Sequence, residues 1–129
     1  MCILVLIGIV CLHLVLYLSP RSTEIGCDFG ILVDSVDAKS SLGIDKSEES
    51  IQIATTRYPD QNFLLRDVFE DDLDIGPKTP LVVSIDINGN RELPAVLKCI
   101  QFALDSWSPR LIMVKSRELH AKMTSEDKN

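Results

Sequence analysis

Acidic and glycine residues recur at regular intervals along the first two thirds of the chain. In order they are the segment Glu24-Ile-Gly-Cys-Asp-Phe-Gly30, then Asp45, Asp67 and Asp86. Gly26 and Asp45 lie 19 positions apart, and Asp45 and Asp67 lie 22 positions apart. Each interval fits one strand-helix-strand repeat, so the carboxylates should emerge together at one edge of a parallel sheet. Open α/β sheets bind nucleotide-like ligands at that edge.

The elements that must position these residues alternate between strands and helices. A buried run at 81–87 and another at 111–114 predict interior strands, because both are nearly continuous in apolar residues. Ser47 is a suitable N-cap, with acidic residues in the first turn that follows it. The expected strands end at 24, 45, 65, 87 and 114, and the expected helices occupy 29–38, 48–58 and the stretch between 90 and 107. This alternation requires parallel pairing and indicates the α/β class.

Length and composition define one domain and restrict the classes of partner. The 129 residues fit a single domain at 22–115, preceded by a hydrophobic segment at 1–21 and followed by a polar tail at 116–129, where we expect a frayed helical turn. The net charge is −6 and no basic stripe is visible, so a nucleic acid is not indicated as a partner. Four cysteines without CxxC spacing and two distant histidines indicate no metal site, and the cysteines suit reduced intracellular thiols.

The apolar run at 2–18 has three interpretations, which the sequence leaves open. As a helix its 17 residues would span about 25 Å, slightly less than the ~30 Å of a bilayer core. It could anchor the chain in a membrane with a cytosolic globular part, as Arg21 on its C-terminal side suggests. A secretory signal is the second interpretation, although no positive charge precedes the run. The third is an aberrant start to the chain, which would make the protein cytoplasmic.

The spaced acids and the glycine turn together resemble the class I S-adenosylmethionine-dependent methyltransferases over about residues 24–115. The segments at 85–93 and 109–116 look like methyltransferase-like proteins of plants. The resemblance implies a Rossmann-like, mostly parallel sheet flanked by helices. In the family the sheet continues past the fifth strand into an antiparallel hairpin, whereas this sequence stops after about the fifth strand. The strand at 111–114 would then have an uncovered edge through which chains could self-associate.

The resemblance also implies the residues that bind S-adenosylmethionine. The glycine turn would pass beneath the methionine portion, with Asp28 in place of the family's middle glycine. Asp45 matches the acid that holds both ribose hydroxyls, a task suited to a carboxylate because it accepts several hydrogen bonds. Asp67 matches the acid beside the adenine amino group. The full implied set is Glu24, Gly26, Asp28, Gly30, Asp45, Asp67, Val68 and Asp86.

The function implied is methyl transfer, and the acceptor stays open. Ile87-Asn-Gly89 after Asp86 differs from the signature of amino-group methyltransferases, so no acceptor class is indicated. A non-catalytic, membrane-tethered fragment of the same fold is an alternative. A third hypothesis is an NAD-type module, since Gly43-Ile-Asp45 also suits a dinucleotide site, but the turn lacks the order G-x-G-x-x-G.

Overall fold

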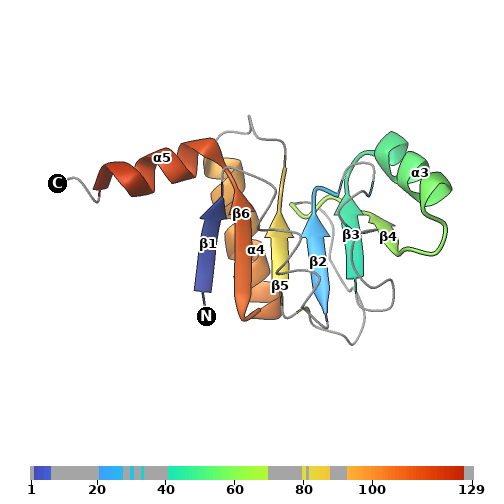
Figure 1. Ribbon diagram of the computed structural model, residues 1–129, viewed down its shortest axis with the longest axis horizontal. Coiled ribbons are helices and arrows are strands. Elements are labelled where there is room, and N and C mark those ends of the chain that lie inside the picture. The colour runs from blue at the N-terminus through green and yellow to red at the C-terminus, as the bar shows by residue number, and fades with distance from the viewer. Residues whose placement is uncertain are drawn as a thin grey trace.

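A computed structural model describes residues 2–6, 21–27, 30, 33, 41–69, 80, 82–87 and 93–126. Its centre is a six-stranded sheet in the order β1-β6-β5-β2-β3-β4, and all five neighbouring pairs are parallel (Figure 1). The strands are β1 (Cys2–Leu6), β2 (Ser22–Ile25), β3 (Ser41–Asp45), β4 (Phe63–Leu65), β5 (Val82–Ile85) and β6 (Leu111–Lys115). The predicted α/β class and Rossmann-like sheet are confirmed.

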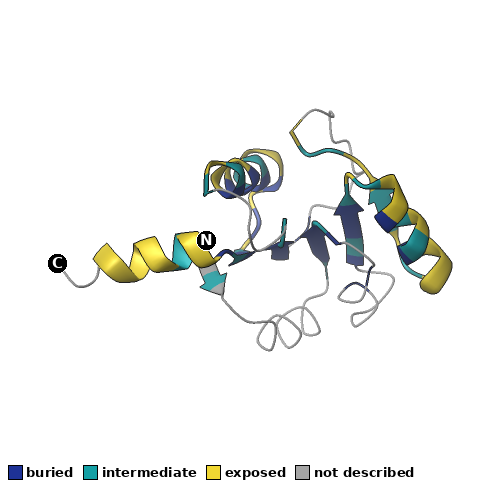
Figure 2. Cartoon of the chain, turned by 90° about the horizontal axis from the view of Figure 1, so that it is seen from above, coloured by how far each residue is buried: buried dark blue, intermediate teal, exposed yellow. Residues whose placement is uncertain are grey.

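Three described helices accompany the sheet: α3 (Glu48–Arg57), α4 (Leu93–Trp107) and α5 (Arg117–Glu126). The helix α3 begins where predicted, since the side chain of Ser47 accepts a hydrogen bond from the backbone N–H of Ser50 at 3.2 Å. The helix α4 lies across one face of the sheet, and α5 extends beyond the β1 end (Figure 2). The helix expected at 29–38 lies outside the described residues, apart from Gly30 and the helical Val33.

The hydrophobic core lies between α4 and the sheet. Alternate residues of each strand point to one face, and Val83 and Ile85 of β5 and Ile112 of β6 belong to one buried cluster with residues of α4. The buried cluster comprises Ile25, Ile44, Val83, Ile85, Val96, Cys99, Ile100, Ala103, Trp107, Ile112 and Val114. It joins four strands to α4 and so fixes the positions at which the strands end.

The strand β1 corrects two expectations about the N-terminal segment. It pairs in parallel with β6, from Cys2 beside Leu111 to Leu6 beside Lys115. The edge of β6 is therefore covered, and the expected self-association through an uncovered 111–114 strand loses its basis. A 17-residue helix over 2–18 is also wrong, because the first five of those residues form a strand. Within the described part of the chain, none of the helices has the length and apolar character that crossing a membrane requires.

Two further boundaries differ from the sequence-based expectation. The polar tail forms the ten-residue helix α5 rather than a frayed turn, and Glu118 in its first turn accepts a hydrogen bond from Leu93 N at 3.0 Å. This contact joins the beginnings of α5 and α4. The strand β2 continues one residue past Glu24, and all four of its residues are buried even though Ser22, Thr23 and Glu24 are polar.

Candidate functional site

A cavity of about 310 Å³ opens at the carboxyl ends of the strands. We call it the edge cavity. Gly26, Asp45, Asp67, Val68 and Asp86, five of the eight residues in the predicted set, line it. The other lining residues are Ile25, Ile44, Lys46, Ser47, Ser50, Arg66, Phe69, Ile87 and Ala95. The sheet order explains why residues 60 positions apart in the chain meet here, since β5, β2, β3 and β4 are consecutive neighbours.

Gly26 lies immediately after β2, where the chain bends under the edge cavity. Its φ is +81°, in the left-handed region that favours glycine. A Cβ at this position would lie 2.1 Å from the backbone oxygen of Asp86, so no larger residue fits without moving β5. The bend is held from the other side by β3, because Gly26 N donates to Ile44 O at 2.7 Å. The result is a close backbone approach that leaves open space above it.

Asp45 is the last residue of β3 and faces the edge cavity next to the start of α3. Its Oδ1 accepts a hydrogen bond from Ser47 N at 2.9 Å. Its backbone oxygen accepts one from Arg66 N at 3.0 Å, which joins the end of β3 to the turn after β4. A carboxylate can accept several hydrogen bonds at once, so Asp45 suits a ligand that donates two hydroxyl groups.

Asp67 and Phe69 form a tight turn on the β4 side of the edge cavity. Asp67 Oδ1 accepts a hydrogen bond from Phe69 N at 3.0 Å. The ring of Phe69 is 45% exposed although it lines the cavity. Lys98 Nζ of α4 lies 5.8 Å from the centre of that ring, within the range of a cation–π contact. An aromatic face therefore borders the cavity next to the Asp67 carboxylate.

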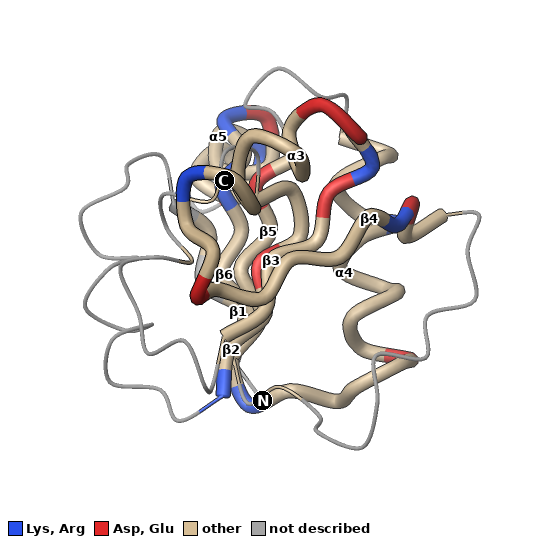
Figure 3. The backbone as a smooth tube through the Cα atoms, turned by 90° about the vertical axis from the view of Figure 1, so that its right-hand side faces the viewer, with Lys and Arg blue, Asp and Glu red and all other residues tan. Residues whose placement is uncertain are grey.

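Asp86 directly follows β5 and forms an ion pair with Lys115 at the end of β6. Lys115 Nζ lies 3.3 Å from Asp86 Oδ2, and the two side chains are 28% and 29% exposed. Asp86 N donates to Ile25 O at 3.0 Å, so the backbone of β2 fixes this end of β5 as well. Charged residues of both signs gather at the side of the molecule where the strands have their carboxyl ends (Figure 3).

Two described residues of the predicted set, Glu24 and Gly30, do not line the edge cavity. Glu24 is 6% exposed and pairs in register with Gly43 and Ser84, on the sheet face opposite α4. Gly30 is buried, with a φ of +84°, and a Cβ there would lie 2.6 Å from the ring of Phe63. Asp28 lies outside the described residues.

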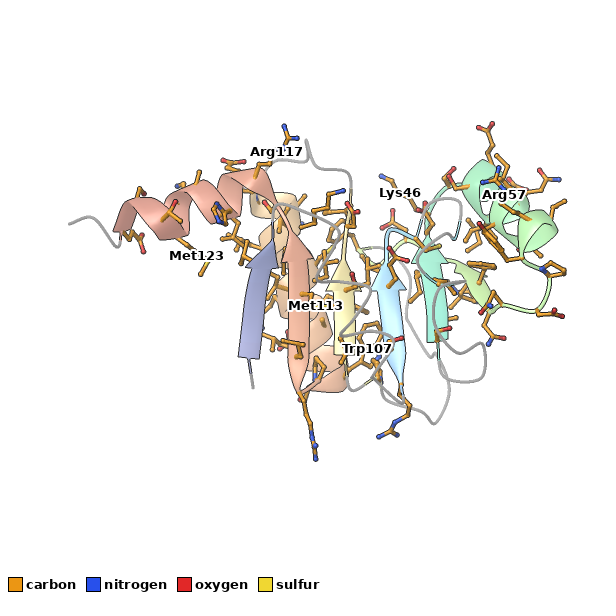
Figure 4. All side chains as sticks on the ribbon, viewed as in Figure 1. Lys46, Arg57, Trp107, Met113, Arg117 and Met123 are labelled. Carbon is orange, nitrogen blue, oxygen red and sulfur yellow. The ribbon has the colours of Figure 1, made fainter. Side chains whose placement is uncertain are left out.

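The structure also adds polar residues that the sequence analysis did not select. Lys46 and Ser47 follow Asp45 directly, and Arg66 precedes Asp67. Lys46 lies at the carboxyl ends of β2 and β3 (Figure 4). The sequence signal for Lys46, Ser47 and Arg66 was their position next to a strand end, because side chains just past parallel strands lie at the same edge of the sheet. Ala95 comes from α4 and offered no such signal.

The edge cavity combines carboxylates, two cationic side chains and apolar walls. Such a lining suits a ligand with hydroxyl and amino donors on an otherwise apolar body. No group of three His, Cys, Asp or Glu residues that could hold a metal ion occurs within the described ranges.

Comparisons with known proteins give matches among solved structures alone. No family model matches the chain, and the search of curated proteins found no match. DesVI of Streptomyces venezuelae superposes with a TM-score of 0.59 at 13% identity, over 77% of this chain and 43% of that protein. Magnesium protoporphyrin IX methyltransferase from Synechocystis gives 0.55 at 16% identity, over 74% and 48%. The plantazolicin methyltransferase BpumL gives 0.51 at 21% identity, over 76% and 39%.

The chain spans less than half the length of these three proteins. These superpositions and the parallel sheet of the chain support the same fold. The chain therefore has the fold of the class I S-adenosylmethionine-dependent methyltransferases.

Proposed function

We propose that the chain binds S-adenosylmethionine in the edge cavity and belongs to a methyltransferase. The observation that carries this proposal is that Gly26, Asp45 and Asp67 line one cavity at consecutive strand ends. Two of the similar structures lend support, since the Synechocystis protein was crystallised with S-adenosylmethionine and BpumL with its demethylated product. A volume of about 310 Å³ is at the lower end of the range for small-molecule pockets.

The residues present fit this cofactor. At Gly26, the lack of a side chain lets the bend after β2 pack against the backbone of Asp86, and this bend lines the part of the cavity where the methionine portion would lie. Asp45 would accept hydrogen bonds from the two ribose hydroxyls, each worth about 1.5–3 kcal/mol because the acceptor is charged. Asp67 would accept from the adenine amino group, with Val68 and Phe69 along the base. Glu24 and Gly30 would support the turn from beneath, as neither lines the cavity.

When bound, the cofactor supplies a methyl group on a positively charged sulfur, which becomes a neutral thioether once that group has left. The protein then has mainly to align the acceptor and exclude water. A general base is needed only for an acceptor that must lose a proton. We therefore propose methyl transfer to an acceptor whose identity the cavity does not specify.

Isothermal titration of the full chain with S-adenosylmethionine tests the proposal directly. We expect saturable binding of one ligand per chain, weakened roughly tenfold to a hundredfold by Asp45→Ala, through the loss of one or two charged hydrogen bonds. Asp60→Ala is the matched control, because Asp60 is exposed and does not line the cavity. Equal affinity in the wild type and Asp45→Ala would contradict the assignment of the site.

A turnover assay and a titration with NAD distinguish the two other hypotheses. A non-catalytic fragment would bind the cofactor but would not convert it to the demethylated product with any acceptor extract. An NAD-type module would bind NAD more tightly than S-adenosylmethionine.

Association with a membrane through 2–18 also stays a hypothesis, which flotation with vesicles tests. With 2–6 in the sheet, the remaining 12 residues would reach only about 18 Å as a helix, short of the ~30 Å bilayer core.

A further inference from the structure

We propose that Lys115 sets how strongly the edge cavity prefers the charged cofactor over its neutral product, by compensating the charge of Asp86. This inference rests on the proposed function. Neither the ion pair nor Lys115 was part of the predicted site. The Asp86–Lys115 pair is the single salt bridge between described side chains, and Asp86 lines the cavity.

The strand order determines which end of the ligand lies beside the pair. Along the sheet, β4, β3, β2, β5 and β6 are consecutive, so Asp67, Asp45, Gly26, Asp86 and Lys115 follow one another at the carboxyl edge. If Asp67 takes the base and Asp45 the ribose, the part beyond the ribose points toward Gly26 and Asp86. That part carries the sulfonium. Among the described residues, Asp86 would thus be the carboxylate at the sulfonium end of the cavity.

The geometry around Asp86 keeps its charge in a fixed place. Its backbone N–H is bonded to Ile25 O at 3.0 Å, and its peptide oxygen lies against Gly26. Its carboxylate meets Lys115 Nζ at 3.3 Å, and both side chains are about 70% buried. The screening of a charge by solvent is weaker for partly buried groups than for exposed ones, so Lys115 cancels a large part of the field that Asp86 would exert on the cavity.

This compensation matters for methyl transfer because the positive charge on sulfur disappears during the reaction. An uncompensated carboxylate beside the sulfonium would stabilise the bound cofactor more than the transition state, in which that charge is already smaller. Binding that is stronger in the ground state than in the transition state lowers the rate of the chemical step. Lys115 would reduce this excess stabilisation without removing the carboxylate.

The test compares two ligands that differ in the sulfonium charge. The dissociation constants of S-adenosylmethionine and S-adenosylhomocysteine are measured by titration, and their ratio isolates the effect of charge, since the adenosine, amino and carboxylate groups are common to both. For Lys115→Met we expect the preference for S-adenosylmethionine to rise by about threefold to tenfold, as an uncompensated carboxylate attracts a nearby cation. For Asp86→Asn we expect a change of similar size in the opposite direction.

Two control variants, a salt series and thermal melting make the result unambiguous. Lys115→Arg keeps the charge and should retain the wild-type ratio, and Lys122→Met, an exposed lysine of α5, should also leave it unchanged. The change in Lys115→Met should shrink as salt is raised from 0.05 to 0.5 M (about 14 to 4 Å in screening length), because screening shortens the reach of the charge. Thermal melting checks that each variant is folded.

The outcomes separate this inference from the proposed function. A wild type that binds both ligands, with ratios unchanged in Lys115→Met and Asp86→Asn, would overturn the role of the pair and leave the cofactor site standing. Ratios that shift in the directions opposite to those expected would overturn it too. A wild type that binds neither ligand would overturn the proposed function and this inference with it.

Discussion

Gly26 and Asp86 come from neighbouring strands and approach so closely that a Cβ on Gly26 would lie 2.1 Å from the peptide oxygen of Asp86. This contact joins β2 to β5 at the point where the edge cavity opens. Because the obstacle is backbone and not the end of a flexible side chain, the position accepts only glycine.

Gly26→Ala should therefore destabilise the fold and reduce ligand binding together. The left-handed backbone alone costs a residue with a side chain about 1–3 kcal/mol, and displacement of β5 would add to that. Urea unfolding measures the loss. Thr56→Ala on the exposed side of α3 is the control and should change the free energy of unfolding by less than about 0.5 kcal/mol. A similar small change in Gly26→Ala would show that the two backbones are not in contact.

Ser47→Ala should separate stability from binding. The Ser47 hydroxyl caps α3, and loss of such a cap costs about 0.5–2 kcal/mol. The hydrogen bond to Asp45 uses the backbone N–H of Ser47 and survives the substitution. Urea unfolding should thus show a clear loss, while cofactor affinity falls less than in Asp45→Ala. Equal losses of affinity in the two variants would mean that the hydroxyl itself contacts the ligand.

Ile44→Ala should test whether the cluster under α4 is the core. Ile44 is fully buried, and truncation of such a residue costs about 2–5 kcal/mol, as a cavity is left behind. Leu97 on the outer side of α4 is 47% exposed, and Leu97→Ala should cost far less. The comparison is made by urea unfolding of both variants. A larger loss in Leu97→Ala would contradict the orientation of α4.

Glu118→Ala should loosen the beginning of α4. The carboxylate of Glu118 accepts the Leu93 N–H at 3.0 Å, and this N–H has no partner within its own helix at that position. Hydrogen exchange at Leu93 should become faster in the variant, whereas Arg117→Ala, which removes the neighbouring side chain, should leave it unchanged. Unchanged exchange in Glu118→Ala would show that α5 does not cap α4.

Removal of residues 1–6 should increase self-association. The deletion takes away β1 and exposes the edge of β6, whose free backbone groups can pair with another chain. Sedimentation velocity on the full and shortened chains measures the effect. Ile3→Thr changes an exposed side chain of β1 while keeping the strand, and it should behave as the full chain does. A shortened chain that remains as monomeric as the full one would argue that β1 does not protect β6.

The sequence by itself determined the elements whose signals are local. The cap at Ser47, the apolar runs that became β5 and β6 and the apolar stripe of α4 each depend on residues within a few positions of one another. Strand-end spacing then predicted that Gly26, Asp45, Asp67 and Asp86 would share one edge, because parallel strands joined by crossovers end on the same side.

Tertiary structure decided the contacts between residues distant in the chain. The pairing of β1 with β6, the ion pair of Asp86 with Lys115 and the cap that Glu118 provides for α4 all join segments more than 20 positions apart. Local patterns do not encode such partners, since the free energy of each contact depends on which surfaces the rest of the fold brings together. The burial of Glu24 in β2 also depends on distant segments, because its neighbours Gly43 and Ser84 in the sheet belong to β3 and β5.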